Sequence, residues 1–129
     1  MGAKITGHGT SVMRIEGVAK LNPTTYQIMP DRIEAGTLLL AGAITGGDVT
    51  VEKCNPHDLE ALIGKLKESG FKIETGMNSI RILPQKDFQA VDITTAPHPL
   101  FATDLQAQFM ALMTVAHGTS VITETVFEN

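Results

Sequence analysis

The sequence predicts an α/β fold built from a β-α-β-α-β-β unit, and three features of its 129 residues indicate this class. Residues 33–45 and 56–69 carry apolar patterns typical of helices. Short alternating segments bounded by glycine or proline lie between them. A helix, a glycine and an alternating strand then recur at an offset of 72, aligning GGDVTVE (46–52) with GTSVITE (118–124). The recurrence indicates a duplicated supersecondary unit.

The first helix and strand are predicted from composition and alternation. Residues 33–45 are apolar nearly all round, which predicts a buried helix, and Gly46-Gly47 predicts its end. The segment 48–53 alternates, with Val49 and Val51 on one face, and this predicts a half-buried strand.

The second helix carries the clearest signals in the chain. Asn55 is a predicted N-cap and Pro56 suits the first turn, while Gly70 predicts the end. One apolar stripe is formed by Leu59, Leu62, Ile63 and Leu66. Two strands, 71–75 and 79–83, are predicted to form a hairpin around the glycine-containing turn between them.

These elements divide the chain into three predicted parts. Residues 1–30 are rich in glycine and contain two strand candidates, 11–15 and 26–29. We expect this part to be the end of a neighbouring domain and the strands between the two domains. Residues 31–84 are predicted to form one complete unit. Residues 85–129 are predicted to form the first half of the next unit, and they contain a strand at 91–94, a helix at 104–117 and a strand at 121–127. Since the second unit is incomplete, we expect the chain to be a fragment.

Composition excludes several classes of protein. Hydrophobic residues make up 43% and charged residues 19%, which is typical of a folded globular protein. The net charge of −4, without a cluster of lysine or arginine, argues against a nucleic-acid partner. The longest apolar run, 38–44, is too short to span a bilayer, and the N-terminus does not resemble a signal peptide. With a single cysteine, these features predict a cytoplasmic protein.

Neither a metal nor a cofactor is predicted. The four histidines lack the spacing of metal ligands, and Gly7-His8-Gly9 is not followed by the residues of a phosphate-binding loop. Cys54 lies between a predicted strand and a helix, where we expect a small buried thiol. The nearby helix start would favour a lowered pKa for this thiol and mild reactivity.

Three segments, in order along the chain, resemble the UDP-N-acetylglucosamine enolpyruvyl transferases. They are YQIMPDRIEAGTLLLAGA (26–43), TAPHPLFATDLQAQF (95–109) and ITETVFEN (122–129). The resemblance implies an inside-out α/β fold of two domains, each made of three β-α-β-α-β-β units, with the active site between them. It also implies transfer of the enolpyruvyl group of phosphoenolpyruvate to the 3-hydroxyl of UDP-N-acetylglucosamine, with release of phosphate, in peptidoglycan synthesis.

The resemblance also assigns roles to five residues. It implies that Asp104, in TDLQAQ, contacts the sugar 3-hydroxyl and is the candidate general base; the alternative is a helix N-cap. It implies that Val126 and Phe127 line the sugar-nucleotide pocket; the alternative is ordinary packing. Asp31 and Arg32 match charged positions near the cleft; the alternative is a turn residue and a surface ion pair.

The groups that the resemblance requires for phosphoenolpyruvate have no counterpart here. These are the catalytic cysteine on its loop, the N-terminal lysine and asparagine, and the arginines that bind phosphoenolpyruvate; Cys54 is not the catalytic cysteine. We therefore expect the chain to be inactive alone. One alternative is a non-enzymatic repeat-built module that associates with itself or a partner. Another is a relative from the shikimate pathway, which the APHP, TDLQAQ and TETVFEN segments disfavour.

Overall fold

The first apolar segment forms helix α1 (Arg32–Thr45) in the computed structural model, which describes residues 1–127. The side chain of Asp31 caps its first turn, and Gly46 ends it with a φ of 64°, a conformation that suits glycine. The N–H of Gly46 donates to the carbonyl of Ala43. Strand β3 (Val49–Glu52) follows, as alternation predicts.

The second predicted helix forms in two parts. Asn55 accepts a hydrogen bond from the N–H of His57 and so caps the 3₁₀ helix η1 (Pro56–Leu59). Helix α2 (Glu60–Glu68) continues from it, and Leu62, Ile63 and Leu66 are buried on its inner face. The apolar stripe and the cap are thus confirmed, although the first turn is tighter than an α-helix.

Two more strands complete a small antiparallel sheet. Strand β4 (Ile73–Thr75) and strand β5 (Ser79–Ile82) form the predicted hairpin, closed by a hydrogen bond from the N–H of Gly76 to the carbonyl of Ser79. The strand order is β3-β5-β4, so β5 lies in the centre and its Ile82 stands opposite both Val49 and Ile73.

The second unit has the predicted elements with shorter bounds. Strand β6 (Ile93–Thr94), 3₁₀ helix η2 (Thr103–Leu105), helix α3 (Gln106–Met113) and strand β7 (Ile122–Thr123) follow in order, and β6 pairs with β7 in parallel. The predicted helix 104–117 therefore begins as a 3₁₀ turn and ends early, at Met113. Beyond it the N–H groups of Val115 and Ala116 donate three residues back, to Leu112 and Met113, and that of His117 donates to the carbonyl of Phe88.

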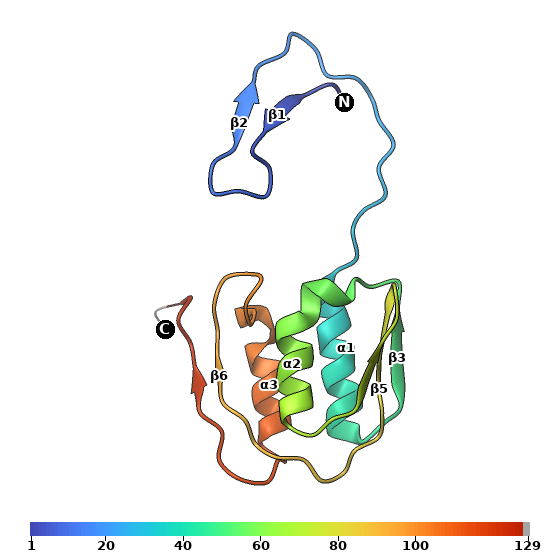
Figure 1. The fold of residues 1–129 in the computed structure, drawn as a ribbon, viewed down its shortest axis with the longest axis vertical. Coiled ribbons are helices and arrows are strands. Elements are labelled where there is room, and N and C mark those ends of the chain that lie inside the picture. Colours follow the sequence, from blue (N-terminus) through green and yellow to red (C-terminus); the bar gives the residue numbers. More distant parts are fainter. Residues whose placement is uncertain (128–129) are drawn as a thin grey trace.

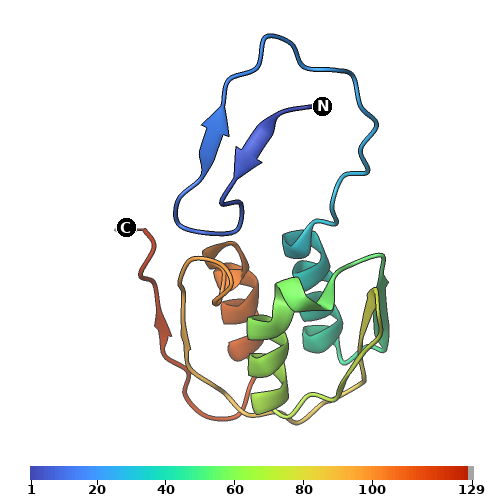
Figure 2. The ribbon, with the colours of Figure 1, turned by 45° about the horizontal axis from the view of Figure 1, so that its top comes forward.

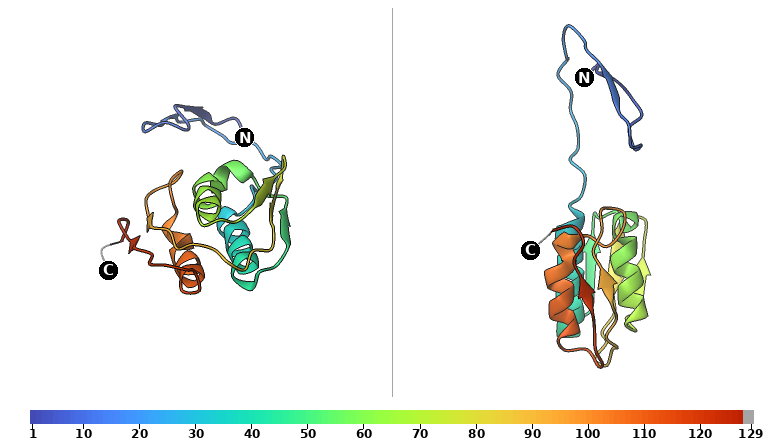
Figure 3. Two further views of the ribbon diagram at one scale, coloured as in Figure 1. Left: turned by 60° about the horizontal axis from the view of Figure 1, so that its bottom comes forward. Right: turned by 90° about the vertical axis from the view of Figure 1, so that its left-hand side faces the viewer.

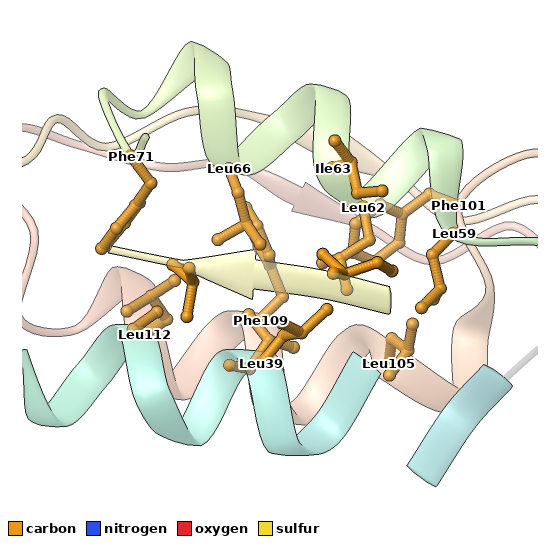
Figure 4. Packing of buried hydrophobic residues seen from close by; sticks show 14 of the residues in the cluster. Leu39, Leu59, Leu62, Ile63, Leu66, Phe71, Phe101, Leu105, Phe109 and Leu112 are labelled. Atoms are coloured by element: carbon orange, nitrogen blue, oxygen red, sulfur yellow. The ribbon is translucent and has the colours of Figure 1, made fainter. Parts of the chain in front are cut away.

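The three helices lie together in the middle of the body, with β3 and β5 on one side of them and β6 and β7 on the other (Figures 1 and 3). Helices α1 and α3 lie side by side, joined by a hydrogen bond of 3.0 Å from the side-chain amide of Gln108 to the hydroxyl of Thr37, and α2 packs against them. Figure 4 shows the leucines and phenylalanines of α2 and the loops pointing toward those of α1 and α3. The core therefore joins both units into one body. Among residues 1–127, no helix combines the length and the hydrophobicity that crossing a membrane requires.

The internal repeat is visible in the helices but not in the strands. At the offset of 72, Leu40 and Leu112 are both buried, and Gly46 and Gly118 both have positive φ. The strands differ by one position, because Val49 is half-buried whereas the aligned Val121 is exposed and its neighbour Ile122 faces inward. A shift of one residue reverses the faces of a strand, so the alignment holds for the helix and its glycine only.

The N-terminal region departs from the prediction. The predicted strand 26–29 is wrong, since this segment pairs with no strand among the described residues and Tyr26 is 74% exposed. Strand β1 (Lys4–Thr6), which the sequence did not predict, pairs with β2 (Arg14–Glu16), which overlaps the predicted strand 11–15. Figures 1 and 2 show this hairpin standing apart from the body, joined to α1 by an extended segment. Alternation alone cannot supply the partner that a strand requires.

Glycine at position 42 permits the close approach of α1 to the sheet. A Cβ there would lie 2.9 Å from Cγ2 of Val49, closer than real Cβ contacts, and 3.1 Å from Cγ2 of Ile82, which is tighter than most. We expect Gly42→Ala to lower the free energy of unfolding by about 1–3 kcal/mol. Gly64→Ala, in α2 with nothing near its added Cβ, should instead raise it by about 0.5–1 kcal/mol. Urea unfolding measures both, and equal effects would contradict the packing argument.

Candidate functional site

The candidate residues gather at the end of the body where α1 and α3 begin. Asp31 caps α1, and Asp104 lies in η2, immediately before α3. The chain after β7 runs toward the same end, where the N-terminal hairpin also lies (Figure 1). The sequence-predicted residues therefore come from three segments but share one end of the fold.

The carboxylate of Asp104 is exposed and does not cap a helix. Ala102 and Leu105 occupy the cap positions of η2 and α3, and neither helix start receives a side-chain cap. Within residues 1–127, the carboxylate of Asp104 makes no hydrogen bond or ion pair with another side chain or with the backbone. The N-cap alternative is therefore wrong, and the carboxylate is open to a ligand.

Val126 and Phe127 are also exposed, at 39% and 63%. Core packing, the alternative role, is therefore wrong for Phe127 and accounts for only part of the surface of Val126. Strand β7 ends at Thr123, so these two residues lie beyond the β-ladder. Their side chains offer an apolar surface beyond the end of β7.

Glu124 links the turn that carries Asp104 to the segment of Val126 and Phe127, although the sequence analysis did not predict it as a site residue. Its Oε2 accepts a hydrogen bond of 2.7 Å from the hydroxyl of Thr103, and its Oε1 accepts one of 2.7 Å from the hydroxyl of Thr95. Oε1 also accepts from the N–H groups of Val126 (2.6 Å) and Phe127 (3.2 Å). The only signal available was a glutamate in an alternating strand, and that pattern predicts a solvated side chain.

This environment strongly favours the ionised form of Glu124. The hydrogen bond from Thr103 lowers the pKa of Glu124 most, and partial burial opposes it. With the further bonds from Thr95 and the two backbone N–H groups, the pKa of Glu124 falls to about 2. Its stabilising contribution is therefore complete above the ordinary carboxyl pKa near 4.5 and is lost as pH falls toward 2.

Asp31 and Arg32 lie on the neighbouring helix and have no direct contact with the Glu124 network. Oδ1 of Asp31 accepts hydrogen bonds from the N–H groups of Ile33 (2.7 Å) and Glu34 (3.2 Å). The side-chain Nε of Arg32 is buried without a hydrogen-bond partner among residues 1–127. Asp31 therefore has a structural role as a cap, and its place beside the cleft stays a prediction.

A cavity of about 320 Å³ lies beside Asp31, between the start of α1 and the end of β3. Cys54 lines it, and its thiol donates to the carbonyl of Val51 at 3.5 Å. The cysteine is buried as predicted, but the expected lowering of its pKa is wrong, because burial raises the pKa of this thiol. In the described part of the chain, no group of three or more histidine, cysteine or acidic side chains is placed to hold a metal ion.

The two roles considered for Asp31 can be separated by substitution. Asp31→Ala removes the acceptor for the N–H groups of Ile33 and Glu34, so we expect the free energy of unfolding to fall by about 1 kcal/mol. Asp31→Asn keeps the cap and removes the charge, so the free energy of unfolding should change by only a few tenths of a kcal/mol. Thermal unfolding of both variants measures this, and an equal loss in both would mean that the charge, not the cap, stabilises α1.

Curated relatives match the chain along its whole length. It is 76% identical over 129 residues to the UDP-N-acetylglucosamine 1-carboxyvinyltransferase of Bdellovibrio bacteriovorus, and covers 31% of that protein. It is 57% identical over 129 residues to UDP-N-acetylglucosamine 1-carboxyvinyltransferase 2 of Prochlorococcus marinus, of which it covers 30%. The chain thus spans less than a third of the length of these relatives.

A solved structure and a family model agree with this result. The enolpyruvyl transferase NikO from Streptomyces tendae superposes with a TM-score of 0.81 over 99% of this chain and 31% of its own, at 24% identity. The shared fold confirms the predicted α/β class. The model of the EPSP synthase family, described as 3-phosphoshikimate 1-carboxyvinyltransferase, matches residues 1–129. The chain therefore belongs to the EPSP synthase family.

Proposed function

We propose that this chain forms one wall of the UDP-N-acetylglucosamine site in an enzyme that transfers the enolpyruvyl group of phosphoenolpyruvate to the sugar 3-hydroxyl. The observation that carries the proposal is the 76% identity, over all 129 residues, to a protein named UDP-N-acetylglucosamine 1-carboxyvinyltransferase. The exposed groups of Asp104, Val126 and Phe127 at one end of the fold support it.

The chemistry of this wall suits the acceptor substrate. An alcohol that attacks phosphoenolpyruvate must lose its proton, and a positioned carboxylate can accept it. The open carboxylate of Asp104 is proposed for this role, and the apolar surfaces of Val126 and Phe127 are proposed to contact the sugar nucleotide. Asp31 and Arg32 are proposed to add charges near the cleft.

The proposed substrate, UDP-N-acetylglucosamine, is taken from the names of the similar proteins and not from the name of the family model. The family model is named for 3-phosphoshikimate, whereas seven curated relatives, 52–76% identical to this chain, are named for UDP-N-acetylglucosamine. The segment TDLQAQ at 103–108 supports the same choice. The place proposed for the reaction is peptidoglycan synthesis in the cytoplasm, where it would affect cell shape and division.

The chain by itself is proposed to be inactive. Phosphoenolpyruvate carries negative charge that requires cationic partners in the transition state. The lysine, the arginines and the cysteine loop that serve this purpose in the resembling enzymes have no counterpart in residues 1–129. Release of phosphate from phosphoenolpyruvate and UDP-N-acetylglucosamine, with this chain as the sole protein, would contradict this part of the proposal.

An NMR titration tests whether the chain binds the sugar nucleotide. We expect UDP-N-acetylglucosamine at millimolar concentration to shift the amide signals of Asp104, Val126 and Phe127, and Asp104→Ala to weaken the shifts. Asp87→Ala is the matched control, since Asp87 lies beside the far end of α1 and α3, in an exposed pair with His117. Equal shifts in all three proteins, or shifts far from Asp104, would contradict the proposed site.

A second candidate function is association through the outer face of α1 and α3. Leu38 and Met110 occupy aligned positions on these helices, and both are about half exposed, at 50% and 48%. Val115 extends the same apolar character beyond α3. Such a face favours association with a further copy or a partner. Light scattering tests self-association, and a monomer at high concentration would exclude self-association as the function.

A further inference from the structure

The side chain of Glu124 holds together three segments that are distant in the sequence. One carboxylate accepts hydrogen bonds from Thr95 at the end of β6, from Thr103 at the start of η2, and from the N–H groups of Val126 and Phe127. Thr95 is fully buried, so this acceptor also satisfies a polar group in the core. Hydrogen bonds to an ionised acceptor are roughly twice as strong as neutral ones.

The position of these donors connects Glu124 to the proposed site. Thr103 directly precedes Asp104, so its bond to Glu124 fixes the turn that carries the proposed base. The ladder between β6 and β7 ends at Thr123, so beyond it the chain depends on side chains. There, the N–H of Thr125 donates to the hydroxyl of Thr95, and Glu124 accepts from the two residues that follow.

The first unit indicates that the fold itself does not require this arrangement. The strand of the first unit also carries a glutamate, Glu52 at the end of β3, and Asp31, before helix α1, lies at the offset of 72 from Thr103. Glu52 is exposed, and within the described residues its carboxylate accepts no hydrogen bond. Asp31 points its carboxylate at the first turn of α1 instead, and two carboxylates could not form the Thr103–Glu124 bond. The network is therefore particular to the end that carries Asp104, Val126 and Phe127.

We infer that Glu124 is a positioning residue, which holds the turn of Asp104 and the segment of Val126 and Phe127 in one preformed surface for the sugar nucleotide. The identity of the ligand rests on the proposed function; the network itself does not. Glu124 acts through its neighbours, because its two oxygens are already directed at Thr95, Thr103 and the two N–H groups.

The first part of the test needs no ligand. Amide hydrogen exchange is compared in the unaltered chain, Glu124→Ala, Glu124→Gln and the control Glu52→Ala. We expect Glu124→Ala to speed exchange at Val126 and Phe127 about tenfold or more, with the core amides of α3 unchanged, because the lost bonds lie outside the core. Glu124→Gln should be intermediate, since its amide oxygen can still accept from the backbone. Unchanged exchange at both residues, or loss of protection throughout α3, would overturn the positioning role.

The second part measures binding. UDP-N-acetylglucosamine is titrated into the unaltered chain, Glu124→Ala, Asp104→Ala and the double variant. We expect Glu124→Ala to weaken binding about tenfold, and Asp104→Ala to add little in that background, because both changes remove the same positioned contact. Glu52→Ala should bind as the unaltered chain does. Losses that multiply in the double variant would mean independent residues and would overturn the inference.

The two proposals fail in different ways. If the unaltered chain does not bind the sugar nucleotide, the proposed function of the chain as a preformed wall fails. In that case, the exchange of the Val126 and Phe127 amides alone decides whether Glu124 holds the segment. If the chain binds and Glu124→Ala binds equally well with a folded core, the proposed function stands and the positioning role is rejected.

Discussion

Truncation of Phe109 to alanine is expected to lower the free energy of unfolding by about 3–5 kcal/mol. The ring is fully buried on α3, and its centroid lies 5.2 Å from that of Phe101 in an edge-on arrangement of 76°. Removing it leaves a cavity where the two units meet, and the surrounding helices can fill it only in part. Urea unfolding followed by circular dichroism measures the loss, with the denaturant slope unchanged if the transition stays two-state.

Two controls separate this packing effect from a general sensitivity to losing a ring. Phe127→Ala removes a ring that is mostly exposed, and we expect a change within about 0.5 kcal/mol. Phe101→Ala, alone and combined with Phe109→Ala, completes a double-mutant cycle in which a coupling of about 0.5–1.5 kcal/mol is expected. A loss below about 1 kcal/mol for Phe109→Ala would mean that the core between α1, α2 and α3 repacks easily.

The helices were predictable because their signals are local. The cap at Asn55, the apolar stripe and the glycine at position 46 each act within one or two turns, and each is found where the sequence indicates. The strand 26–29 was wrong because its alternation says nothing about a partner. The one-residue shift between β3 and β7 could not be predicted either. Strand β3 pairs antiparallel with β5, whereas β7 pairs in parallel with β6, and the local sequence does not show these pairings.

The candidate site was likewise predicted only in part. The resemblance named Asp104, Val126 and Phe127, and the structure gives each of them an exposed position at one end of the body. Glu124 was missed because its role depends on Thr95 and Thr103, which come near it only after β6 and β7 pair in parallel. Likewise, burial raises the pKa of the Cys54 thiol. The local sequence does not show whether a cysteine that precedes a helix is buried or exposed.

The proposed proton acceptor is tested most directly in a chimera. The 129 residues of this chain would replace the matching 31% of the Bdellovibrio bacteriovorus relative, to which they are 76% identical. In this protein we expect Asp104→Asn to lower kcat for phosphate release by about 10²–10⁴-fold, because asparagine keeps the size of the side chain but cannot accept the proton. Asp87→Asn, in an exposed pair far from the site, should leave kcat unchanged.

The kinetic pattern decides between the two roles that Asp104 can have. If Asp104 only orients the sugar, its contact is made equally in the ground state and the transition state, and Asp104→Asn raises the KM for UDP-N-acetylglucosamine with kcat nearly unchanged. If Asp104 takes the proton, kcat falls and the substrate still binds. The open carboxylate is free for either role, since Asp104 makes no competing contact within residues 1–127, so the kinetics decide. A full kcat in Asp104→Asn would reject the base and leave the 3-hydroxyl to another acceptor.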